Sequence, residues 1–269
     1  MAQFFSLSPE MVVWITGASS GIGEALATTC AAKGCRMVLS ARNSDALEAL
    51  AKRLRAQAPE IMVLPLDLAQ ASEQAGDWTA QVMARFGRID VLVNNAGVSQ
   101  RATALETPEA LERSLFEVNY FAPVALSKAV LPAMMQAGGG QLVVVSSIAG
   151  KFGFFYRSTY SAAKHALHGY FESLRLEYED RGIRVLMVCP GKVKTNISLM
   201  AQTPAGAHGV MDPSHAEAMT AEACAHEVMQ AIEEGREEVL VGGKELWMVR
   251  LKRWWPSLFR RLLRRVPRM

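Results

Sequence analysis

The chain has 269 residues, of which 50% are hydrophobic and 20% are charged, and its formal net charge is +3. This length is sufficient for one large domain with a substantial core, and the composition is that of an ordinary soluble protein. No apolar run reaches the roughly 18 residues that a membrane-spanning helix needs. The first ten residues contain no basic residue of the kind that begins a secretory signal. We therefore expect a cytoplasmic protein.

Short apolar runs alternate with longer segments of helical character. The expected strands cover residues 11–16, 36–41, 61–66, 90–94, 142–147, 184–189 and 238–241. The expected helices between them include residues 44–58, 72–86, 108–136, 158–181 and 220–234, with Thr107 as the N-cap before Pro108. Most strand runs are almost wholly apolar, which is typical of strands covered on both faces. The pattern predicts a single-domain, Rossmann-like α/β fold with a doubly wound parallel sheet of about seven strands and helices on both faces.

Residues 196–219 interrupt this alternation. The segment lies between the sixth expected strand and the next helix, and it contains Pro204, Gly206, Gly209 and Pro213. Loops of this length are usually functional or disordered. We expect a loop that covers a ligand.

A glycine loop follows the first expected strand and begins a helix. Its sequence, TGASSGIG, covers residues 16–23, and the glycines are Gly17, Gly21 and Gly23. Gly17 permits a tight turn, Gly21 lets the backbone approach a pyrophosphate, and Gly23 allows a helix to pack closely on a strand. The helix N-terminus adds N–H donors and a positive dipole end. The loop predicts a dinucleotide site, and an ordinary glycine-rich turn is the alternative.

The end of the second expected strand distinguishes between two dinucleotides. An acidic residue there would bond the ribose 2′-hydroxyl of NAD, whereas an arginine suits a 2′-phosphate. The sequence has Arg42 at this place and no acid. This favours NADP(H), with a solvated residue at the start of a helix as the alternative.

Tyr160 and Lys164 lie one helical turn apart, so their side chains leave the same face. A phenol normally keeps its proton until about pH 10, and a neighbouring ammonium favours the phenolate. Such a tyrosine suits general acid–base catalysis. The pair alone also fits a half-exposed helix face, but Ser147 ends an apolar run and Asn119 lies within a helical segment.

Together the TGxxxGIG loop, the YxxxK pair, Ser147 and Asn119 resemble the short-chain dehydrogenase/reductase (SDR) family, over residues 11 to about 243. The resemblance implies the strand order 3-2-1-4-5-6-7. It also implies that Tyr160 donates a proton to a carbonyl oxygen, and that Lys164 bonds the nicotinamide ribose and lowers the tyrosine pKa. Ser147, with Ser146 as a neighbour of the same type, would hydrogen-bond the same oxygen. Asn119 would hold a water that links Lys164 to bulk solvent.

The resemblance also implies a set of cofactor-binding residues. Asp67 would contact adenine, although a helix cap is its alternative, and the NNAG run at 94–97 would lie beside the ribose. Lys192 and Lys194 stand where many relatives have apolar residues, which leaves the detail of that loop open. The implied NADP(H)-binding residues are Gly17, Ser19, Ser20, Gly21, Ile22, Gly23, Arg42, Asp67, Leu68, Asn94, Ala96, Gly97, Tyr160, Lys164, Pro190, Gly191, Val193 and Thr195.

We therefore expect residues 1–243 to form an NADP(H)-dependent catalytic domain, with 196–219 as its substrate loop or lid. It would interconvert a carbonyl and a secondary alcohol. A non-catalytic NADP-binding regulatory or scaffold protein is the alternative. The expected substrate is hydrophobic (lipid-, steroid- or aromatic-like), because apolar residues surround the site, although core or subunit contacts would also explain them. These residues are Phe152, Phe154, Phe155, Tyr156, Leu199, Met200 and Met211.

Two further expectations concern metals and subunits. His165 and His168 are three residues apart, but no nearby carboxylate or cysteine in the sequence completes a metal site, and the four cysteines show no zinc-like spacing. We therefore expect no metal and four buried reduced thiols. We also expect a homo-oligomer, either a dimer or a tetramer.

The C-terminal extension, residues 244–269, differs in charge from the rest of the chain. It holds nine basic residues and one acidic residue, a net charge of +8, so residues 1–243 carry −5. Its amphipathic pattern with tryptophans favours peripheral contact of 247–269 with the inner face of a membrane, and it is similar to extensions of membrane-associated hydroxysteroid-dehydrogenase-like SDRs. A helix docked on a subunit or on the chain itself remains an alternative. We expect no specific nucleic-acid contact, because no recognition fold accompanies the charge.

Overall fold

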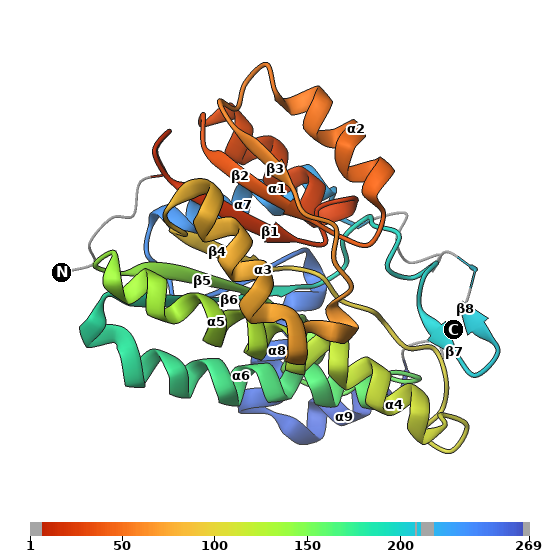
Figure 1. Ribbon diagram of the computed structural model, residues 1–269. Helices are drawn as coiled ribbons and strands as arrows, with labels where there is room; N and C mark the ends of the chain where they lie inside the picture. Colours follow the sequence, from red (N-terminus) through yellow and green to blue (C-terminus); the bar gives the residue numbers. More distant parts are fainter. Residues whose placement is uncertain (1–6, 208, 211–217, 266–269) are drawn as a thin grey trace.

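The computed structural model describes residues 7–207, 209–210 and 218–265. A parallel sheet forms its centre, with helices on both faces (Figure 1). In spatial order the strands are β3 (Ile61–Val63), β2 (Arg36–Ser40), β1 (Val12–Thr16), β4 (Val91–Asn94), β5 (Gly140–Val145), β6 (Ile183–Pro190) and β9 (Glu238–Val241). This confirms the expected order, with β9 as the seventh strand of the sheet.

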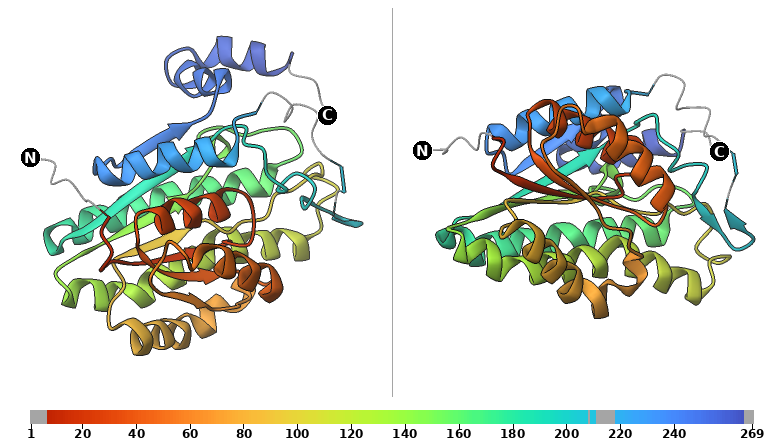
Figure 2. Two further views of the ribbon diagram at one scale, coloured as in Figure 1. Left: turned by 90° about the horizontal axis from the view of Figure 1, so that it is seen from above. Right: turned by 45° about the horizontal axis from the view of Figure 1, so that its top comes forward.

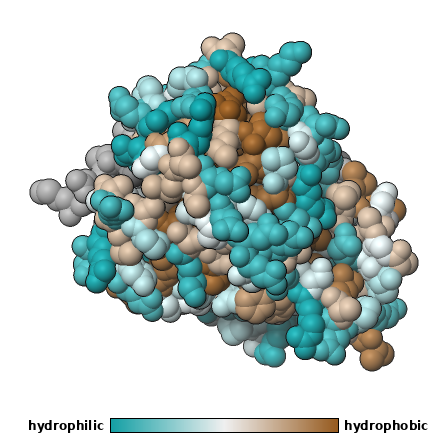
Figure 3. Space-filling model, viewed as in Figure 1, coloured by the Kyte–Doolittle hydropathy of each residue, from teal (hydrophilic) through white to brown (hydrophobic). Residues whose placement is uncertain are grey.

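Two hydrophobic cores lie on opposite faces of the sheet, because successive side chains of a strand point to opposite faces. Val13 and Ile15 of β1 belong to one core, and Val12 and Trp14 belong to the other. The first core is covered by α1 (Gly21–Ala32), α2 (Ser44–Leu54) and α7 (Ala221–Glu233). The second is covered by α3 (Ala71–Phe86), α5 (Ala122–Gln136) and α6 (Ser158–Tyr178). Figure 2 shows both layers, and Figure 3 shows a mainly hydrophilic outer surface on the side viewed.

The long helix expected at 108–136 is divided in the structure. It consists of α4 (Glu109–Phe116), a π-helical turn at Glu117–Phe121, and α5. The expected N-cap is wrong: Pro108 occupies the N-cap position, and the Thr107 hydroxyl donates instead to the Thr103 carbonyl over 2.7 Å. Within residues 196–219, Gln202–Thr203 (β7) and Gly206–Ala207 (β8) form a small antiparallel pair.

The C-terminal extension contains two short helices, α8 (Trp247–Trp254) and α9 (Pro256–Leu263), which lie beyond β9 at the edge of the sheet (Figure 2, left). Leu251 and Phe259 are buried against Ile148 and Phe152. The ring centroids of Phe152 and Phe259 are 5.0 Å apart, and the interplanar angle is 72°. Part of the extension therefore packs on the body of the protein. Within the described residues, no helix is long and apolar enough to span a membrane.

Candidate active site

The fold brings the four expected catalytic residues to the carboxyl ends of the central strands. Ser147 follows β5, Tyr160 and Lys164 lie on α6, and Asn119 lies on the π-helical turn. In doubly wound sheets, ligands bind at these carboxyl ends. The four side chains come from three separate segments, so their proximity is a product of the fold.

Tyr160 is only 7% exposed, and its hydroxyl lies near the Ser147 side chain. Burial raises the pKa of Tyr160 above the ordinary phenol value, while the interaction with Ser147 opposes this rise. The expected lowering of this pKa by Lys164 stays a prediction. The neutral phenol is therefore the stable form at neutral pH, and it is available as a proton donor.

Lys164 is buried, and its Nζ donates to the Val145 carbonyl over 2.8 Å. Burial lowers the pKa of its ammonium to about 8. The Nζ lies 5.9 Å from the centre of the Tyr160 ring. Lys164 thus lies beside the tyrosine, and its own charge is sensitive to pH near neutrality.

Asn119 is fully buried and holds the loop after β4. Its Oδ1 accepts from the Val98 N–H at 3.1 Å, and its Nδ2 donates to the Val98 and Leu115 carbonyls, each at 2.9 Å. A Cβ added at Gly97 would lie 2.9 Å from Asn119 Oδ1 and 3.5 Å from Lys164 Nζ. The backbone at Gly97 therefore passes close to both side chains. A π-helical turn at this place is consistent with a functional site, where such turns are frequent.

The two neighbouring serines have different partners. Ser146 Oγ donates to the Lys164 carbonyl over 3.2 Å and faces the interior of the protein. Ser147 Oγ donates to the Pro190 carbonyl over 3.4 Å, accepts from the Ala149 N–H at 3.1 Å, and lies near the Tyr160 hydroxyl. Ser147 is therefore the serine that faces the tyrosine.

Gln100 is a site residue that the sequence predictions missed. It is fully buried, and its Oε1 accepts from the backbone N–H groups of Thr159 and Tyr160, at 2.9 and 3.2 Å. Its Nε2 donates to Thr107 Oγ1 over 2.7 Å. Gln100 therefore fixes the first turn of α6, on which Tyr160 is carried. No local motif marks it, because its partners are 59 and 60 residues away along the chain.

The glycine loop has the conformation that a dinucleotide site requires. Gly17 and Gly21 have positive φ angles of 65° and 58°, and a Cβ at Gly23 would overlap the Gly17 carbonyl oxygen. Ser20 is the N-cap of α1, but its side chain makes no capping hydrogen bond. The first N–H groups of α1 are thus not capped by Ser20 and can bind an anion.

Asn95 braces this loop from the next strand. Its Nδ2 donates to the Thr16 carbonyl over 2.9 Å and to the Gly17 carbonyl over 3.3 Å. Asn94, which the motif had indicated, instead donates to Ser127 Oγ over 3.0 Å. Asn95 was missed as a site residue, although it lies inside the NNAG run.

Arg42 and Asp67 are the two residues expected to contact the adenosine part of the cofactor. Arg42 is exposed after β2. Asp67 Oδ1 accepts from the Ala69 N–H at 3.1 Å and so caps the short helix that begins at Leu68, which is the alternative given for it above. This cap uses only one of the two carboxylate oxygens of Asp67. Asp67 and the exposed Arg42 are therefore both compatible with a dinucleotide bound at this end.

The segment after β6 is held from two sides. On one side, Lys194 N–H donates to the Met219 carbonyl over 2.8 Å. On the other, Glu245 Oε1 accepts from the Lys192 N–H at 2.8 Å and from the Gly243 N–H at 3.1 Å. Glu245 belongs to the C-terminal extension and was also missed. The extension therefore contacts the segment that contains Pro190, Gly191, Val193 and Thr195.

Thr195 faces the glycine loop. A Cβ added at Gly21 would lie 3.0 Å from Thr195 Cγ2. The segment after β6 and the glycine loop after β1 thus meet at the carboxyl ends of the strands, as a shared nucleotide site requires. Met211 of the expected lid lies outside the described residues. Phe152, expected beside the substrate, is instead buried against α9.

The reason given above for expecting no metal is wrong. The fold brings Cys189 and Glu238 to His168, and one ligand atom of each lies within 4.8 Å of the others. However, Lys151 Nζ lies 3.2 Å from His168 Nδ1 and forms an ion pair with Glu238. A cationic side chain therefore already occupies this cluster. All four cysteines are buried and free, as expected.

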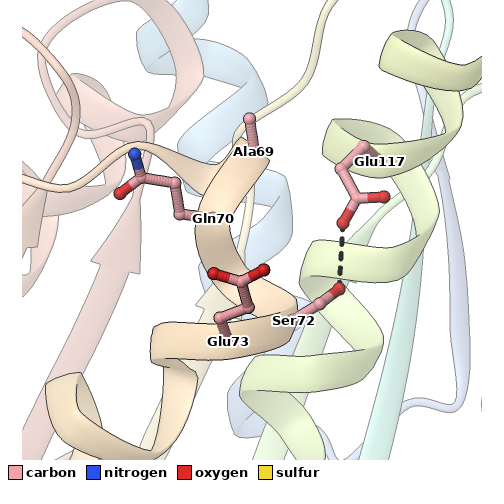
Figure 4. A pocket seen from close by; sticks show the side chains of 5 residues that line it. All are labelled: Ala69, Gln70, Ser72, Glu73 and Glu117. Atoms are coloured by element: carbon pink, nitrogen blue, oxygen red, sulfur yellow. Dashed lines mark hydrogen bonds between the residues drawn. The ribbon is translucent and has the colours of Figure 1, made fainter.

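A separate hollow of about 410 Å³ lies between the start of α3 and the π-helical turn (Figure 4). It is lined by Ala69, Gln70, Ser72, Glu73 and Glu117. Ser72 Oγ donates to Glu117 Oε1 over 2.9 Å. None of the predicted site residues lines it, and its two carboxylates make it a poor site for an anionic cofactor.

Comparison with known proteins agrees with this site. The family profile described as "short chain dehydrogenase" matches residues 11–204. "Dehydrogenase/reductase SDR family member 7B" of Bos taurus is 39% identical over 260 residues, which cover 94% of this chain and 80% of the relative. "Dehydrogenase/reductase SDR family protein 7-like" of Anopheles gambiae is 42% identical over 236 residues, with 86% and 74% covered. The chain belongs to the short-chain dehydrogenase/reductase family.

Solved structures of the same family share this fold. An SDR from Burkholderia phymatum in complex with NAD superposes with a TM-score of 0.83 at 25% identity, covering 94% of this chain and 96% of that one. A metagenomic short-chain oxidoreductase in complex with NADP gives a TM-score of 0.72 at 32% identity, covering 88% and 98%. The protein is thus an SDR oxidoreductase whose structural neighbours bind nicotinamide dinucleotides.

Proposed function

We propose that this protein is an NADP(H)-dependent reductase that interconverts a hydrophobic ketone or aldehyde and the corresponding alcohol. The observation that carries the proposal is that Ser147, Tyr160 and Lys164 lie together at the carboxyl ends of the strands, where the glycine loop also lies. A bound nicotinamide would supply or accept the hydride. The direct test is the oxidation of NADPH in the presence of a panel of carbonyl compounds.

In this proposal the residues of the chain hold the substrate oxygen and move its proton. The hydroxyl groups of Ser147 and Tyr160 bond the carbonyl oxygen, and Tyr160 gives its proton to that oxygen as the alcohol forms. Lys164 would hold the nicotinamide ribose of a bound cofactor, and it offsets the charge left on the phenolate. Asn119 keeps the backbone around Gly97 and Val98 in place, and a water there would return a proton through Lys164.

A hydrophobic substrate is supported by the apolar side chains near this edge. Phe155 is half-buried, and Met200 is 52% exposed on the segment after β6, whereas Phe154 packs on Phe152. Aromatic and methionine side chains form adaptable apolar surfaces. A lipid-, steroid- or aromatic-like carbonyl fits them better than a sugar.

The preference for NADP(H) rests on Arg42. We expect NADPH to bind at least about tenfold more tightly than NADH, which corresponds to roughly 1.4 kcal/mol and is a modest demand on a charge-assisted phosphate contact. Arg42→Ala should lose most of this preference while NADH affinity changes little. Binding isotherms for both cofactors, with the exposed Arg181→Ala as the matched control, would show it. Equal affinities in the unmodified protein would refute the preference.

Glu245 provides a second test of the cofactor site. Glu245→Ala removes the acceptor of two backbone N–H groups, so we expect cofactor affinity to fall about tenfold, while Glu245→Gln, which keeps an oxygen acceptor, should lose less. Isothermal titration with NADPH measures both variants, with the exposed Glu177→Ala as a control for lost charge. If Glu245→Ala binds NADPH as tightly as Glu177→Ala does, the segment after β6 does not depend on Glu245.

The alternative is an NADP-binding regulatory or scaffold protein without turnover. Such a protein needs the glycine loop but has no use for a tyrosine placed beside Ser147 and a buried lysine. The presence of all four catalytic side chains therefore favours the enzyme.

We also propose where the enzyme works and in what assembly. The basic extension supports a cytoplasmic protein held at the inner face of a membrane through residues 247–269. Exposed apolar side chains on the α5–α6 layer, including Leu176 at 75% and Phe121 at 46% exposure, support contact between copies of the chain as a dimer or tetramer.

A further inference from the structure

A second hollow, of about 400 Å³, lies where β9 passes into the C-terminal extension, far along the chain from the glycine loop. It is lined by Leu240, Gly243, Lys244, Leu246, Trp247 and Arg250. The lining thus combines two cationic side chains, one tryptophan and two leucines. This combination suits an amphiphilic anion, which has both a charged group and an apolar part.

The positive charge of this hollow has no acidic partner within the described residues. Lys244 and Arg250 are both exposed, and no described carboxylate forms an ion pair with either. The one acidic residue of the extension, Glu245, has its Oε1 bonded to the N–H groups of Lys192 and Gly243. Its carboxylate is therefore engaged with the segment after β6. An anion that enters the hollow meets two unpaired cations.

The two helices that follow the hollow along the chain carry exposed apolar side chains, although other residues of the same helices are buried. Leu251 and Phe259 are 2% and 5% exposed because they face the body of the protein. Trp254, Trp255 and Leu258 are 68%, 60% and 42% exposed. The two helices therefore have one face that the chain covers and another that nothing in the described chain covers. Tryptophans at such a face are typical of the interface between lipid headgroups and acyl chains.

We propose that this hollow binds the phosphate of an anionic phospholipid headgroup at a bilayer surface. Lys244 and Arg250 bond the phosphate, and Trp254, Trp255 and Leu258 enter the headgroup layer beside it. A nucleic acid would use the charge but would leave the exposed Trp254, Trp255 and Leu258 in water. The charge of the exposed Arg260 and Arg261 on α9, and of Arg264 and Arg265 just after it, attracts the protein to the same surface.

The site rests on the membrane contact proposed above and is independent of the proposed reductase activity, so its test needs no turnover. The full-length protein is sedimented with vesicles of phosphatidylcholine alone and of phosphatidylcholine mixed with phosphatidylglycerol. We expect binding only to the mixed vesicles, and we expect added salt to weaken it. Glycerol phosphate, the soluble headgroup, should compete poorly at millimolar concentrations because it lacks the apolar part.

Two pairs of variants separate the hollow from bulk charge. Lys244→Glu with Arg250→Glu should weaken binding at least about tenfold. Lys52→Glu with Lys128→Glu makes the same change in net charge on α2 and α5, and should leave binding within about twofold. Lys244→Gln with Arg250→Gln repeats the test with less disturbance, should the charge reversal unfold the chain. Trp254→Ala with Trp255→Ala should weaken binding without any change in charge.

Three results would overturn the proposal. Equal binding by the hollow and control pairs would mean that the attraction is diffuse. Equal binding to both kinds of vesicle would mean that no anion is recognised. Full displacement by glycerol phosphate would make the hollow a site for a soluble phosphate ester instead of a lipid.

Discussion

Replacing Tyr160 by phenylalanine is expected to lower turnover by about 10²–10⁴-fold while NADP(H) still binds. The ring stays in its buried position, but the proton donor beside Ser147 is lost. General acid–base catalysis contributes a factor of about this size. The glycine loop is unchanged in this variant, so most of the cofactor affinity should remain. Steady-state rates and NADPH isotherms measured on the same preparation test both parts.

Tyr170→Phe is the matched control for this variant. It removes the same atom from the same helix, at a half-buried position that packs on Tyr120 and Phe171. Its turnover should equal that of the unmodified protein. Near-normal turnover of Tyr160→Phe would contradict the assignment of Tyr160 as the proton donor.

Replacing Lys164 by methionine is expected to lower activity by about 10² or more and to stabilise the fold. Burial lowers the pKa of this ammonium from 10.5 to about 8, so the unfolded chain holds the proton more tightly than the folded protein does. Below pH 8 the folded protein bears the full cost of the buried charge, about 3 kcal/mol. The lost hydrogen bond to Val145 offsets roughly 1 kcal/mol of the gain.

The sign of this effect fixes how it depends on pH. The cost of the buried charge is fully present below about pH 8 and disappears as the pH rises towards 10.5. The stability gained by Lys164→Met should therefore be largest at neutral pH and should shrink over that range. Denaturant unfolding at neutral and alkaline pH measures it, and the exposed Lys128→Met serves as the control. A loss of stability at neutral pH would show that Lys164 is compensated in the folded protein.

Much of the fold could be predicted because strands buried on both faces are nearly continuous apolar runs. β1 and β5 are examples: every residue of each is buried. The π-helical turn could not be predicted, because residues 117–121 have the same helical pattern as their neighbours and only the packing of Asn119 distinguishes them. The N-cap failed for a related reason: Thr107 instead bonds the Thr103 carbonyl and Gln100.

The candidate site could be predicted wherever chemistry depends on spacing along one element. Tyr160 and Lys164 are the clearest case, since one helical turn relates them. Gln100 and Glu245 were missed because each acts on backbone groups more than fifty residues away. Such contacts leave no local pattern. The expected effect of Lys164 on Tyr160 stays a prediction, and burial of the ring acts in the opposite direction on the pKa of Tyr160.

The most direct test of the proposed reductase is to follow NADPH absorbance with the purified full-length protein across a panel of apolar ketones and aldehydes, while the alcohol is measured in parallel. We expect NADPH to be consumed with at least one hydrophobic carbonyl, with one alcohol formed per cofactor oxidised, and we expect Tyr160→Phe to abolish both signals. NADPH that binds tightly but is not consumed with any carbonyl, or alcohol that is not oxidised in the presence of NADP, would contradict the proposal and favour a non-catalytic NADP-binding protein.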